Sequence, residues 1–324
     1  MKIYSAVKLP QVATKLLDDA GIQYEMHNEL STPSEDEIIE KVAHAEVLIS
    51  GVNVPVTEKI IRSNPELKMI ANVGAGTNNI DVETARELNI PVTNTPGDYS
   101  IISTSELALA LMLAVSRNIL SNQEMVQNRD FPGWQVMGYL GGDQVSFKKM
   151  FIMGFGRIGQ EIAKYGKVMH MDVMYYDIQE IDPEVQKELN ARPVSIEEGL
   201  KEADYVVLQM KYTPENHHLI SKNELELMKE SAYLINTARG GVVDEEAVAD
   251  ALEAGKIKGA AFDVHEQEPV MNERLIELDN VVLTPHVGND TYEARNEMAE
   301  TAVDQAIKFI QEQPLDYVIN GVNL

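Results

Sequence analysis

The chain has 324 residues, 44% hydrophobic and 24% charged, with a formal net charge of −25 at pH 7. This length exceeds what one hydrophobic core usually spans, so two domains are expected. The negative charge argues against nucleic-acid and membrane-surface partners, and the lack of cysteine excludes disulfides, thiolate metal sites and a cysteine nucleophile.

The first part of the chain alternates β-rich runs with helical patterns. The strands are expected at residues 2–7, 23–26, 47–50, 69–73 and 92–94, with helices at 35–44 and 82–88 among them. Such alternation predicts a parallel sheet with right-handed crossovers. The first residues form a strand pattern interrupted by charge, unlike a signal peptide, and the cytoplasm is the expected location.

A long apolar helix is expected next. Ser103-Thr104-Ser105-Glu106 has the spacing of a capping box and predicts a helix start there, with an end near Ile119. Its apolar run, residues 107–115, is shorter than the ~20 residues of a membrane span, so a buried helix is expected. Residues 121–149 show no clear period, and a loop of this length predicts a surface excursion or a dimer arm.

A second series of elements follows. Its strands are expected at residues 150–153, 173–176, 205–210, 233–236, 259–262 and 281–283, and its helices at 158–167, 196–202, 244–254 and 292–311. Six strands with helices between them match a dinucleotide-binding sheet. Because the last helix could return to the first domain, we expect a discontinuous substrate domain (1–98 and 288–324) and a nucleotide-binding domain (99–287). The fold class is α/β with two doubly wound parallel sheets.

A glycine fingerprint opens the second series. Gly154, Gly156 and Gly159 follow a strand and begin a helix, which suits a tight turn, the approach of a pyrophosphate and close helix–strand packing. Asp177 ends the next strand, where an acid binds ribose hydroxyls and repels a 2′-phosphate. This pattern predicts NAD rather than NADP; the alternative is a sheet turn with a capping aspartate.

Arg239, Glu268 and His286 each follow one of the later strands. Singly, they could be a surface arginine, a member of an acidic run and a loop histidine. Together they supply a carboxylate clamp, an orienting acid and a proton donor at the sheet edge where ligands bind. This set predicts hydride transfer to a 2-keto acid.

Other candidates are weaker. Gly74, Ala75 and Gly76 follow a strand and predict an anion-binding turn that holds the substrate carboxylate with Arg239; a strand–helix connection is the other interpretation. His217 and His218 are interpreted as structural or rim residues. No H-E-x-x-H motif or carboxylate cluster predicts a metal site.

The blocks at residues 73–81, 236–244 and 284–288 resemble those of the D-isomer-specific 2-hydroxyacid dehydrogenase family. The resemblance implies a Rossmann NAD domain, a flavodoxin-like substrate domain, and a catalytic set of Arg239, Glu268 and His286. It also implies further cofactor contacts, at Thr104, Arg157, Ile158, Thr213, Thr237, Ala238, Asp263 and Gly288.

Within that family the chain is most similar to the glyoxylate/hydroxypyruvate reductases, and residues 51–54 offer no cation for a substrate phosphate. A homodimer is expected. Lys211, Val168 and His170 depart from the family pattern near the cofactor. The alternatives are an NAD(H)-sensing corepressor-like protein, a phosphoglycerate dehydrogenase-like enzyme, or a formate dehydrogenase on the same fold.

Overall fold

The computed structural model describes residues 2–29, 31–137 and 141–322. The chain forms two compact units: Met1–Ser100 with Asn289–Leu324, and Ile101–Gly288. Each unit is built on one parallel sheet, so the predicted fold class, two parallel-sheet α/β units, is confirmed.

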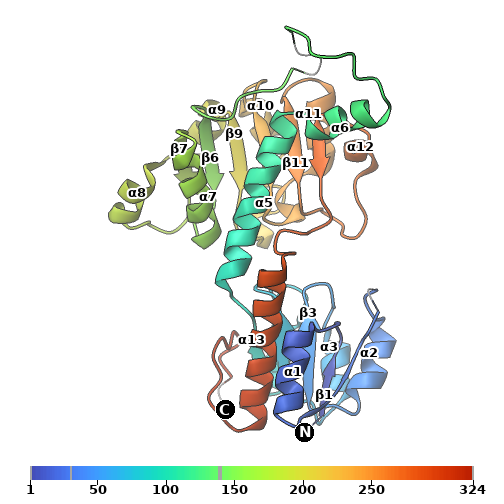
Figure 1. Cartoon of the computed structure of the whole chain (residues 1–324). Helices are drawn as coiled ribbons and strands as arrows, with labels where there is room; N and C mark the ends of the chain where they lie inside the picture. The colour runs from blue at the N-terminus through green and yellow to red at the C-terminus, as the bar shows by residue number, and fades with distance from the viewer. Residues whose placement is uncertain (1, 30, 138–140, 323–324) are drawn as a thin grey trace. The chain divides into compact units, whose positions relative to one another are not determined.

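The first unit contains a five-stranded sheet in the order β2-β1-β3-β4-β5. Figure 1 shows helices α1 and α13 in front of this sheet. Its strands are β1 Lys2–Ser5, β2 Gln23–Met26, β3 Val47–Gly51, β4 Met69–Val73 and β5 Val92–Thr93. Its helices are α1 Gln11–Asp19, α2 Glu35–Val42, α3 Glu58–Ser63, α4 Val82–Glu87 and α13 Tyr292–Ile310. Helices α1 and α13 contact each other and share one apolar core with the sheet, while α2 and α3 contribute to the other.

The second unit contains a seven-stranded parallel sheet in the order β12-β11-β10-β9-β6-β7-β8. Its strands are β6 Lys149–Met153, β7 Asp172–Tyr176, β8 Ala191–Pro193, β9 Tyr205–Leu208, β10 Tyr233–Asn236, β11 Gly259–Phe262 and β12 Val281–Leu283. Its helices are α6 Ile119–Gln127, α7 Arg157–Val168, α8 Pro183–Leu189, α9 Ile196–Glu202, α10 Lys222–Leu227, α11 Glu245–Glu253 and α12 Glu273–Ile276, with short 3₁₀ turns η1 Pro214–Asn216 and η2 Gly240–Val242. Buried apolar clusters lie on both faces of this sheet.

The prediction of six strands was wrong, because the sheet has a seventh, β8. This strand pairs with β7 through Val173 and Ala191 and forms the sheet edge. It has only three residues, too few to show an apolar alternation, and it ends in Pro193, which suits an edge strand. A sequence pattern therefore does not reveal it.

Helix α5 spans Asp98–Ser116, so the predicted start at Ser103 was wrong. The hydroxyl of Ser105 donates to the carbonyl of Ile101 one turn earlier, as serines inside helices do, instead of capping a helix end. The Glu297 carboxylate accepts a hydrogen bond of 3.1 Å from the backbone N–H of Tyr99 in the first turn. A side chain distant in sequence therefore serves the helix start.

Among the described residues, α5 is the one helix long and apolar enough to cross a membrane by length and composition, with a mean hydropathy of 1.5. Its residues Ala108, Leu111, Met112 and Val115 are buried in the core cluster that covers one face of the seven-stranded sheet. Packing in this core accounts for the apolar composition of the helix.

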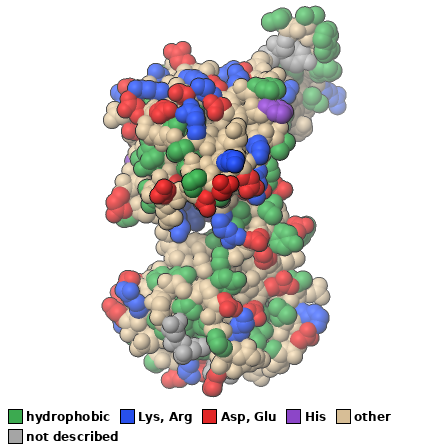
Figure 2. All heavy atoms as spheres, turned by 90° about the vertical axis from the view of Figure 1, so that its left-hand side faces the viewer, with side chains coloured by type: hydrophobic (Ala, Val, Ile, Leu, Met, Phe, Trp, Pro, Cys, Tyr) green, Lys and Arg blue, Asp and Glu red, His purple; other side chains and the backbone are tan. Residues whose placement is uncertain are grey.

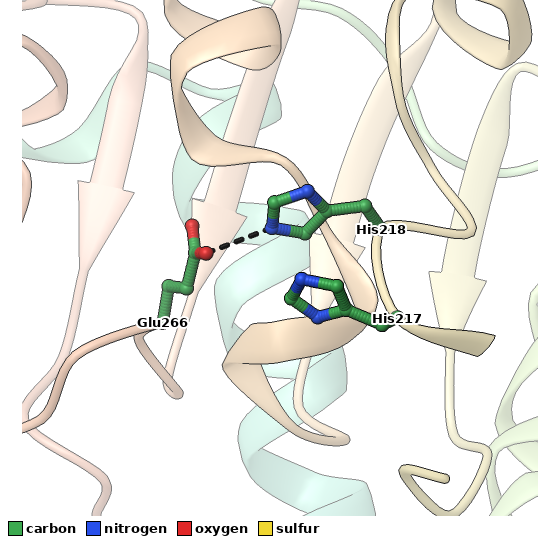
Figure 3. Close-up of side chains that lie close together, drawn as sticks. All are labelled: His217, His218 and Glu266. Atoms are coloured by element: carbon green, nitrogen blue, oxygen red, sulfur yellow. Dashed lines mark hydrogen bonds and ion pairs between the residues drawn. The ribbon is translucent and has the colours of Figure 1, made fainter. Parts of the chain in front are cut away.

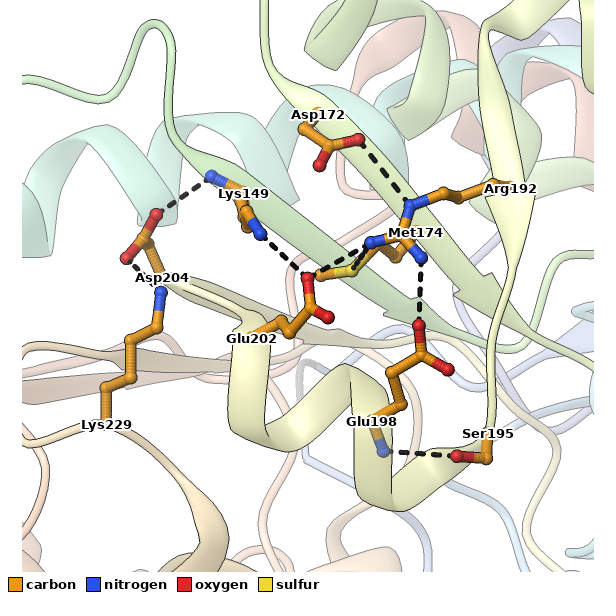
Figure 4. Close-up of polar contacts among 9 residues, drawn as sticks. All are labelled: Lys149, Asp172, Met174, Arg192, Ser195, Glu198, Glu202, Asp204 and Lys229. Atoms are coloured by element: carbon orange, nitrogen blue, oxygen red, sulfur yellow. Dashed lines mark hydrogen bonds and ion pairs between the residues drawn. The ribbon is translucent and has the colours of Figure 1, made fainter.

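A network of charged side chains surrounds the amino ends of β6, β7 and β9 (Figure 4). The Asp204 carboxylate accepts the backbone N–H of Lys149 at 2.9 Å and the ammonium of Lys229 at 2.8 Å. Arg192 donates to Glu198 and to Glu202. These bonds and ion pairs connect the strands at the amino edge of the sheet. The candidate functional residues lie at the opposite edge, where the strands have their carboxyl ends.

Candidate active site

The carboxyl ends of five neighbouring parallel strands, in the order β12-β11-β10-β9-β6, lie along one edge of the large sheet. The glycine fingerprint follows β6, Arg239 follows β10, Asp263 follows β11, and His286 follows β12. In open α/β sheets, ligands bind outside this edge. The topology thus brings together groups that are far apart in sequence.

His286 and Glu268 form a hydrogen-bonded pair, with 2.8 Å between His286 Nδ1 and Glu268 Oε2. The second oxygen, Glu268 Oε1, accepts the backbone N–H of His265 at 3.0 Å. Burial alone would raise the pKa of Glu268, but the hydrogen bonds from His286 and His265 and the nearby imidazole charge lower it. An ionised carboxylate only accepts hydrogen bonds, so Nδ1 carries the proton and Nε2 is the nitrogen left for a ligand.

Arg239 is partly buried and follows β10 directly before η2. Its Nη1 donates to the carbonyl of Ala238 at 2.6 Å. Burial lowers the pKa of the Arg239 guanidinium, and the Glu268 charge opposes that shift, although an arginine stays charged at any physiological pH. The buried Asn236 side chain holds this turn, because it bonds both the Ala238 N–H and the Arg239 carbonyl.

Asp263 organises the loop that carries His286. Its carboxylate, in a residue only 1% exposed, accepts the Thr284 hydroxyl at 2.6 Å and the N–H groups of Val287 and Gly288 at 2.8 Å each. His286 itself has a φ of +54°, an uncommon backbone conformation that such bonds can maintain at a functional position. A contact between Asp263 and the cofactor stays a prediction.

Two buried groups behind the pair, His265 and Glu245, were not predicted from the sequence; each is 5% exposed. His265 Nε2 lies 2.9 Å from the Thr284 carbonyl, and its Nδ1 lies 3.9 Å from Glu245 Oε1. Glu245 also accepts the backbone N–H of Glu266, and burial raises its pKa. His265 therefore links the loop that carries Glu268 to the loop that carries His286. This role depends on contacts between two neighbouring strand ends, which the sequence does not show.

The glycine fingerprint has the space that a dinucleotide requires. Gly154 has a φ of +95°, and a Cβ there would lie 2.6 Å from the backbone of Gln209 and Met210. A Cβ on Gly159 would collide with the carbonyl oxygen of Gly154. At Gly156, the N-cap of α7, a Cβ would meet nothing within 4 Å, so a phosphate can approach the backbone and the helix N-terminus there. These residues fit the pyrophosphate of NAD.

The Asp177 carboxylate faces this turn from the end of β7. It accepts the backbone N–H of Phe155 at 2.6 Å and that of Gln179 at 2.8 Å. The next residue, Ile178, is 89% exposed and offers no positive charge. Asp177 thus supports the glycine turn, and its contact with a ribose stays a prediction.

The remaining predicted cofactor residues lie at several places in the second unit. Thr104 is on α5, and a Cβ on Gly288 would lie 3.4 Å from its side chain. Arg157 and Ile158 form the first turn of α7, while Thr237 and Ala238 are buried after β10. Thr213 is exposed at the start of η1 and donates its N–H to Asn216. Their contacts with a cofactor also stay predictions.

The three departures from the family pattern, at Val168, His170 and Lys211, lie outside the glycine turn. Val168 ends α7, the helix whose first turn follows Gly156, and is 77% exposed. The ring of His170 stacks on Phe147, with 5.2 Å between the centroids. Lys211 is exposed, and its carbonyl accepts the Asn216 side chain.

In the first unit, the turn after β4 differs from what was expected. The Gly74 N–H, which we expected to bind an anion, donates to the Thr95 hydroxyl at 2.7 Å. Ala75 is exposed and Gly76 is partly exposed. If this turn binds a carboxylate, Ala75 and Gly76 rather than Gly74 would supply the N–H groups; their role stays a prediction.

Comparisons with known proteins define the class of this chain, a dinucleotide-binding oxidoreductase. The family model of the D-isomer specific 2-hydroxyacid dehydrogenase NAD binding domain matches residues 109–288. A protein of Staphylococcus aureus (strain USA300), named as a 2-hydroxyacid dehydrogenase, is 39% identical over 319 residues, which are 98% of this chain and 99% of that protein. The chain belongs to the D-isomer specific 2-hydroxyacid dehydrogenase family.

Solved structures show the same fold over nearly the whole chain. The TT0316 protein of Thermus thermophilus is 35% identical, with a TM-score of 0.90 and coverage of 97% of this chain and 98% of that one. The D-lactate dehydrogenase of Aquifex aeolicus, in complex with NAD and lactic acid, is 27% identical, with a TM-score of 0.82 and coverage of 96% of each chain. The chain is therefore an oxidoreductase with an NAD-binding domain.

Proposed function

We propose that this dehydrogenase reduces a small 2-keto acid, such as glyoxylate or hydroxypyruvate, with NADH. The observation that carries the proposal is the His286–Glu268 pair at the sheet edge that also bears Arg239. An imidazole, an orienting carboxylate and a guanidinium are the groups that carbonyl reduction beside a carboxylate requires.

Each residue has a defined task in this proposal. The Arg239 guanidinium binds the substrate carboxylate with two parallel hydrogen bonds and polarises the neighbouring keto oxygen. Glu268 holds the protonated His286 ring, and Nε2 donates its proton to the oxygen as negative charge develops there. The glycine turn after β6 would hold NADH, whose chemistry when bound would be to supply the hydride that C2 of the acid accepts.

The proposed substrate is small and carries one negative charge. The chain has a formal net charge of −25. Residues 51–54, which the family resemblance places near the substrate, contain no cation that would pair with a phosphate. An extra negative charge loses its hydration without gaining a partner, which disfavours phosphorylated and dicarboxylic acids. Glyoxylate and hydroxypyruvate are therefore proposed as better substrates than the phosphorylated acid of a phosphoglycerate dehydrogenase-like enzyme.

The proposed preference for NADH over NADPH rests on Asp177 and the exposed, uncharged Ile178 beside it. A carboxylate at this strand end repels a 2′-phosphate. The test of the proposed function is a screen of NADH and NADPH oxidation with glyoxylate, hydroxypyruvate, pyruvate, 2-ketogluconate and bulkier 2-keto acids. Turnover with none of them would favour a corepressor-like NAD(H) sensor instead.

We also propose a homodimer. Helix α6 has no buried residue, and the segment after it exposes large apolar side chains, with Trp134 exposed to 81%. Figure 2 shows hydrophobic side chains gathered where this part of the second unit projects.

The apolar residues of this surface, which we call the arm, are Ile119, Leu120, Val126, Phe131, Trp134, Val136 and Met137. Residues 138–140 of the predicted excursion lie outside the described part. Exposed patches of this kind mark association surfaces, and a second copy is the proposed partner.

A further inference from the structure

Two histidines and a glutamate that the proposed reaction does not use converge at the carboxyl edge of the large sheet. His217 and His218 follow η1 after β9, and Glu266 lies in the loop after β11. Each offers a nitrogen or oxygen atom that can bind a metal, and these atoms all lie within 4.8 Å of one another. Figure 3 shows the Glu266 carboxylate pointing at the two imidazoles, which lie one beneath the other.

The two rings are held in defined positions. His218 Nε2 lies 2.7 Å from Glu266 Oε1, and the imidazoles stack with 3.9 Å between their centroids. The Tyr212 hydroxyl lies 3.3 Å from His217 Nδ1. A metal-binding histidine usually has its second nitrogen engaged in this way, which orients the ring. The bond to Tyr212 leaves Nε2 of His217 as the nitrogen available for a ligand.

The backbone also fixes the cluster. His218 has a φ of +52°, and its N–H donates to the Gly241 carbonyl at 2.9 Å. Glu266 donates its N–H to the buried Glu245 carboxylate, also at 2.9 Å. Uncommon backbone conformations of non-glycine residues often occur at functional positions. The main chain of His218 and of Glu266 is therefore anchored, and rotation of the three side chains would bring their ligand atoms closer to an ion.

From this geometry we propose that His217, His218 and Glu266 form a binding site for a divalent transition-metal ion of the zinc class. Imidazole nitrogen with one carboxylate oxygen is a ligand set that zinc accepts, with a fourth position left to water. Metal–ligand bonds of about 2.0–2.2 Å place ligand atoms roughly 3.3 Å apart in a tetrahedral site. When an ion binds, the 2.7 Å hydrogen bond between His218 Nε2 and Glu266 Oε1 would be replaced by a bond from each atom to the ion, with the Nε2 proton released to solvent, and the remaining ligand atoms would move inward.

The cluster is accessible to an ion from solvent, because His217 is exposed and His218 and Glu266 are partly exposed. The hydrogen bond between His218 and Glu266 would by itself account for the positions of those two side chains. It gives no function to His217, whose ring stacks on His218. The proposal is independent of the dehydrogenase reaction: neither His286 nor Arg239 belongs to the cluster. The sequence predicted no metal site because the two adjacent histidines and Glu266 lie on two different loops and form no local motif.

The test is metal titration of the full, tag-free chain with Zn²⁺, followed by calorimetry, and with Co²⁺, followed by its visible absorption. We expect one saturable site and a Co²⁺ spectrum typical of imidazole–carboxylate ligation. Loss of an outer-sphere partner alone usually lowers metal affinity about 10–100-fold. Because His217 and Glu266 are proposed as direct ligands, His217→Gln and Glu266→Gln should each weaken Zn²⁺ binding at least tenfold. The matched control is His44→Gln, because His44 is an exposed histidine in the other unit.

Circular dichroism would show that each variant keeps its fold, and Tyr212→Phe would test the orienting contact with a smaller expected loss of affinity. A wild-type chain with no saturable Zn²⁺ or Co²⁺ binding would overturn the proposal. Equal affinities for the wild type and a correctly folded double variant, His217→Gln with Glu266→Gln, would overturn it as well.

Discussion

His286 is held by a side chain on one ring nitrogen and by its own backbone, whose N–H donates to the Asp263 carbonyl at 2.8 Å. Such double support fixes both the tautomer and the direction of the remaining nitrogen. The sequence predicts that Glu268 orients His286, although the two residues follow different strands, and the structure adds the 2.8 Å contact between their side chains. Their residue types and positions at strand ends were enough to nominate both.

Replacing His286 with Ala should remove the proton donor and lower kcat by about 10²–10⁴-fold, with NADH affinity retained. Steady-state kinetics and an NADH fluorescence titration would measure the two quantities. As a control, His170→Ala removes a histidine stacked on Phe147 and should leave kcat unchanged. A near-normal kcat in the His286 variant would disprove the assigned role.

Replacing Glu268 with Gln should change the pH dependence of reduction. Burial raises the pKa of Glu268, but its hydrogen bonds with His286 and His265 lower it below the ordinary value, so the ionised carboxylate places a negative charge beside the His286 ring at neutral pH. An uncharged amide removes this charge, so kcat/KM should fall and its pH profile should change. An unchanged profile would show that the two residues are not coupled during turnover.

At the scale of elements, strong periodic patterns were predictable, and features set by distant partners were not. Strands β2 and β4 have the predicted bounds: β2 follows Gly21 closely, and the mostly apolar β4 ends directly before Gly74. The start of α5 was misplaced since it depends on Glu297, and β8 was missed since it forms through pairing with β7. The Gly74 N–H was assigned to an anion because its partner, Thr95, lies beyond the intervening helix.

The glycine turn after β6 allows a comparison between two substitutions. Gly154→Ala should destabilise the fold, because its Cβ would approach the Gln209 and Met210 backbone and its φ is +95°. Gly156→Ala should leave the melting temperature nearly unchanged, since its Cβ meets no protein atom within 4 Å, yet weaken NADH binding. Calorimetry and NADH titration would measure both effects. Full NADH affinity in the Gly156 variant would contradict a pyrophosphate at this turn.

For the whole molecule, the net charge of −25 predicts a preference among substrates, and the exposed arm predicts association with a second copy. The charge follows from the composition and bears on substrate choice, while the exposure of the arm's apolar side chains is known only from the structure. The sequence suggested an excursion or dimer arm from the length of the aperiodic stretch, and its proposed partner rests on the exposed apolar surface. A cytoplasmic location stays a prediction from the sequence.

The arm predicts the mass of the particle in solution. Light scattering at micromolar protein concentration should give twice the mass of the chain, because a stable association would bury the apolar arm. Replacing Trp134 and Met137 with Ser should shift the equilibrium toward monomer, and Val168→Ser, at an exposed apolar residue outside the arm, should not. A wild-type chain that stays monomeric would contradict the proposed dimer.

The most direct test of the proposed activity is kcat/KM with NADH for glyoxylate, hydroxypyruvate, 3-phosphohydroxypyruvate and oxaloacetate, measured under one set of conditions. We predict that glyoxylate or hydroxypyruvate ranks first, because a second negative charge would enter the site without a partner. If 3-phosphohydroxypyruvate ranked first, a cation must bind its phosphate, and the assignment to small monoanionic 2-keto acids would be wrong.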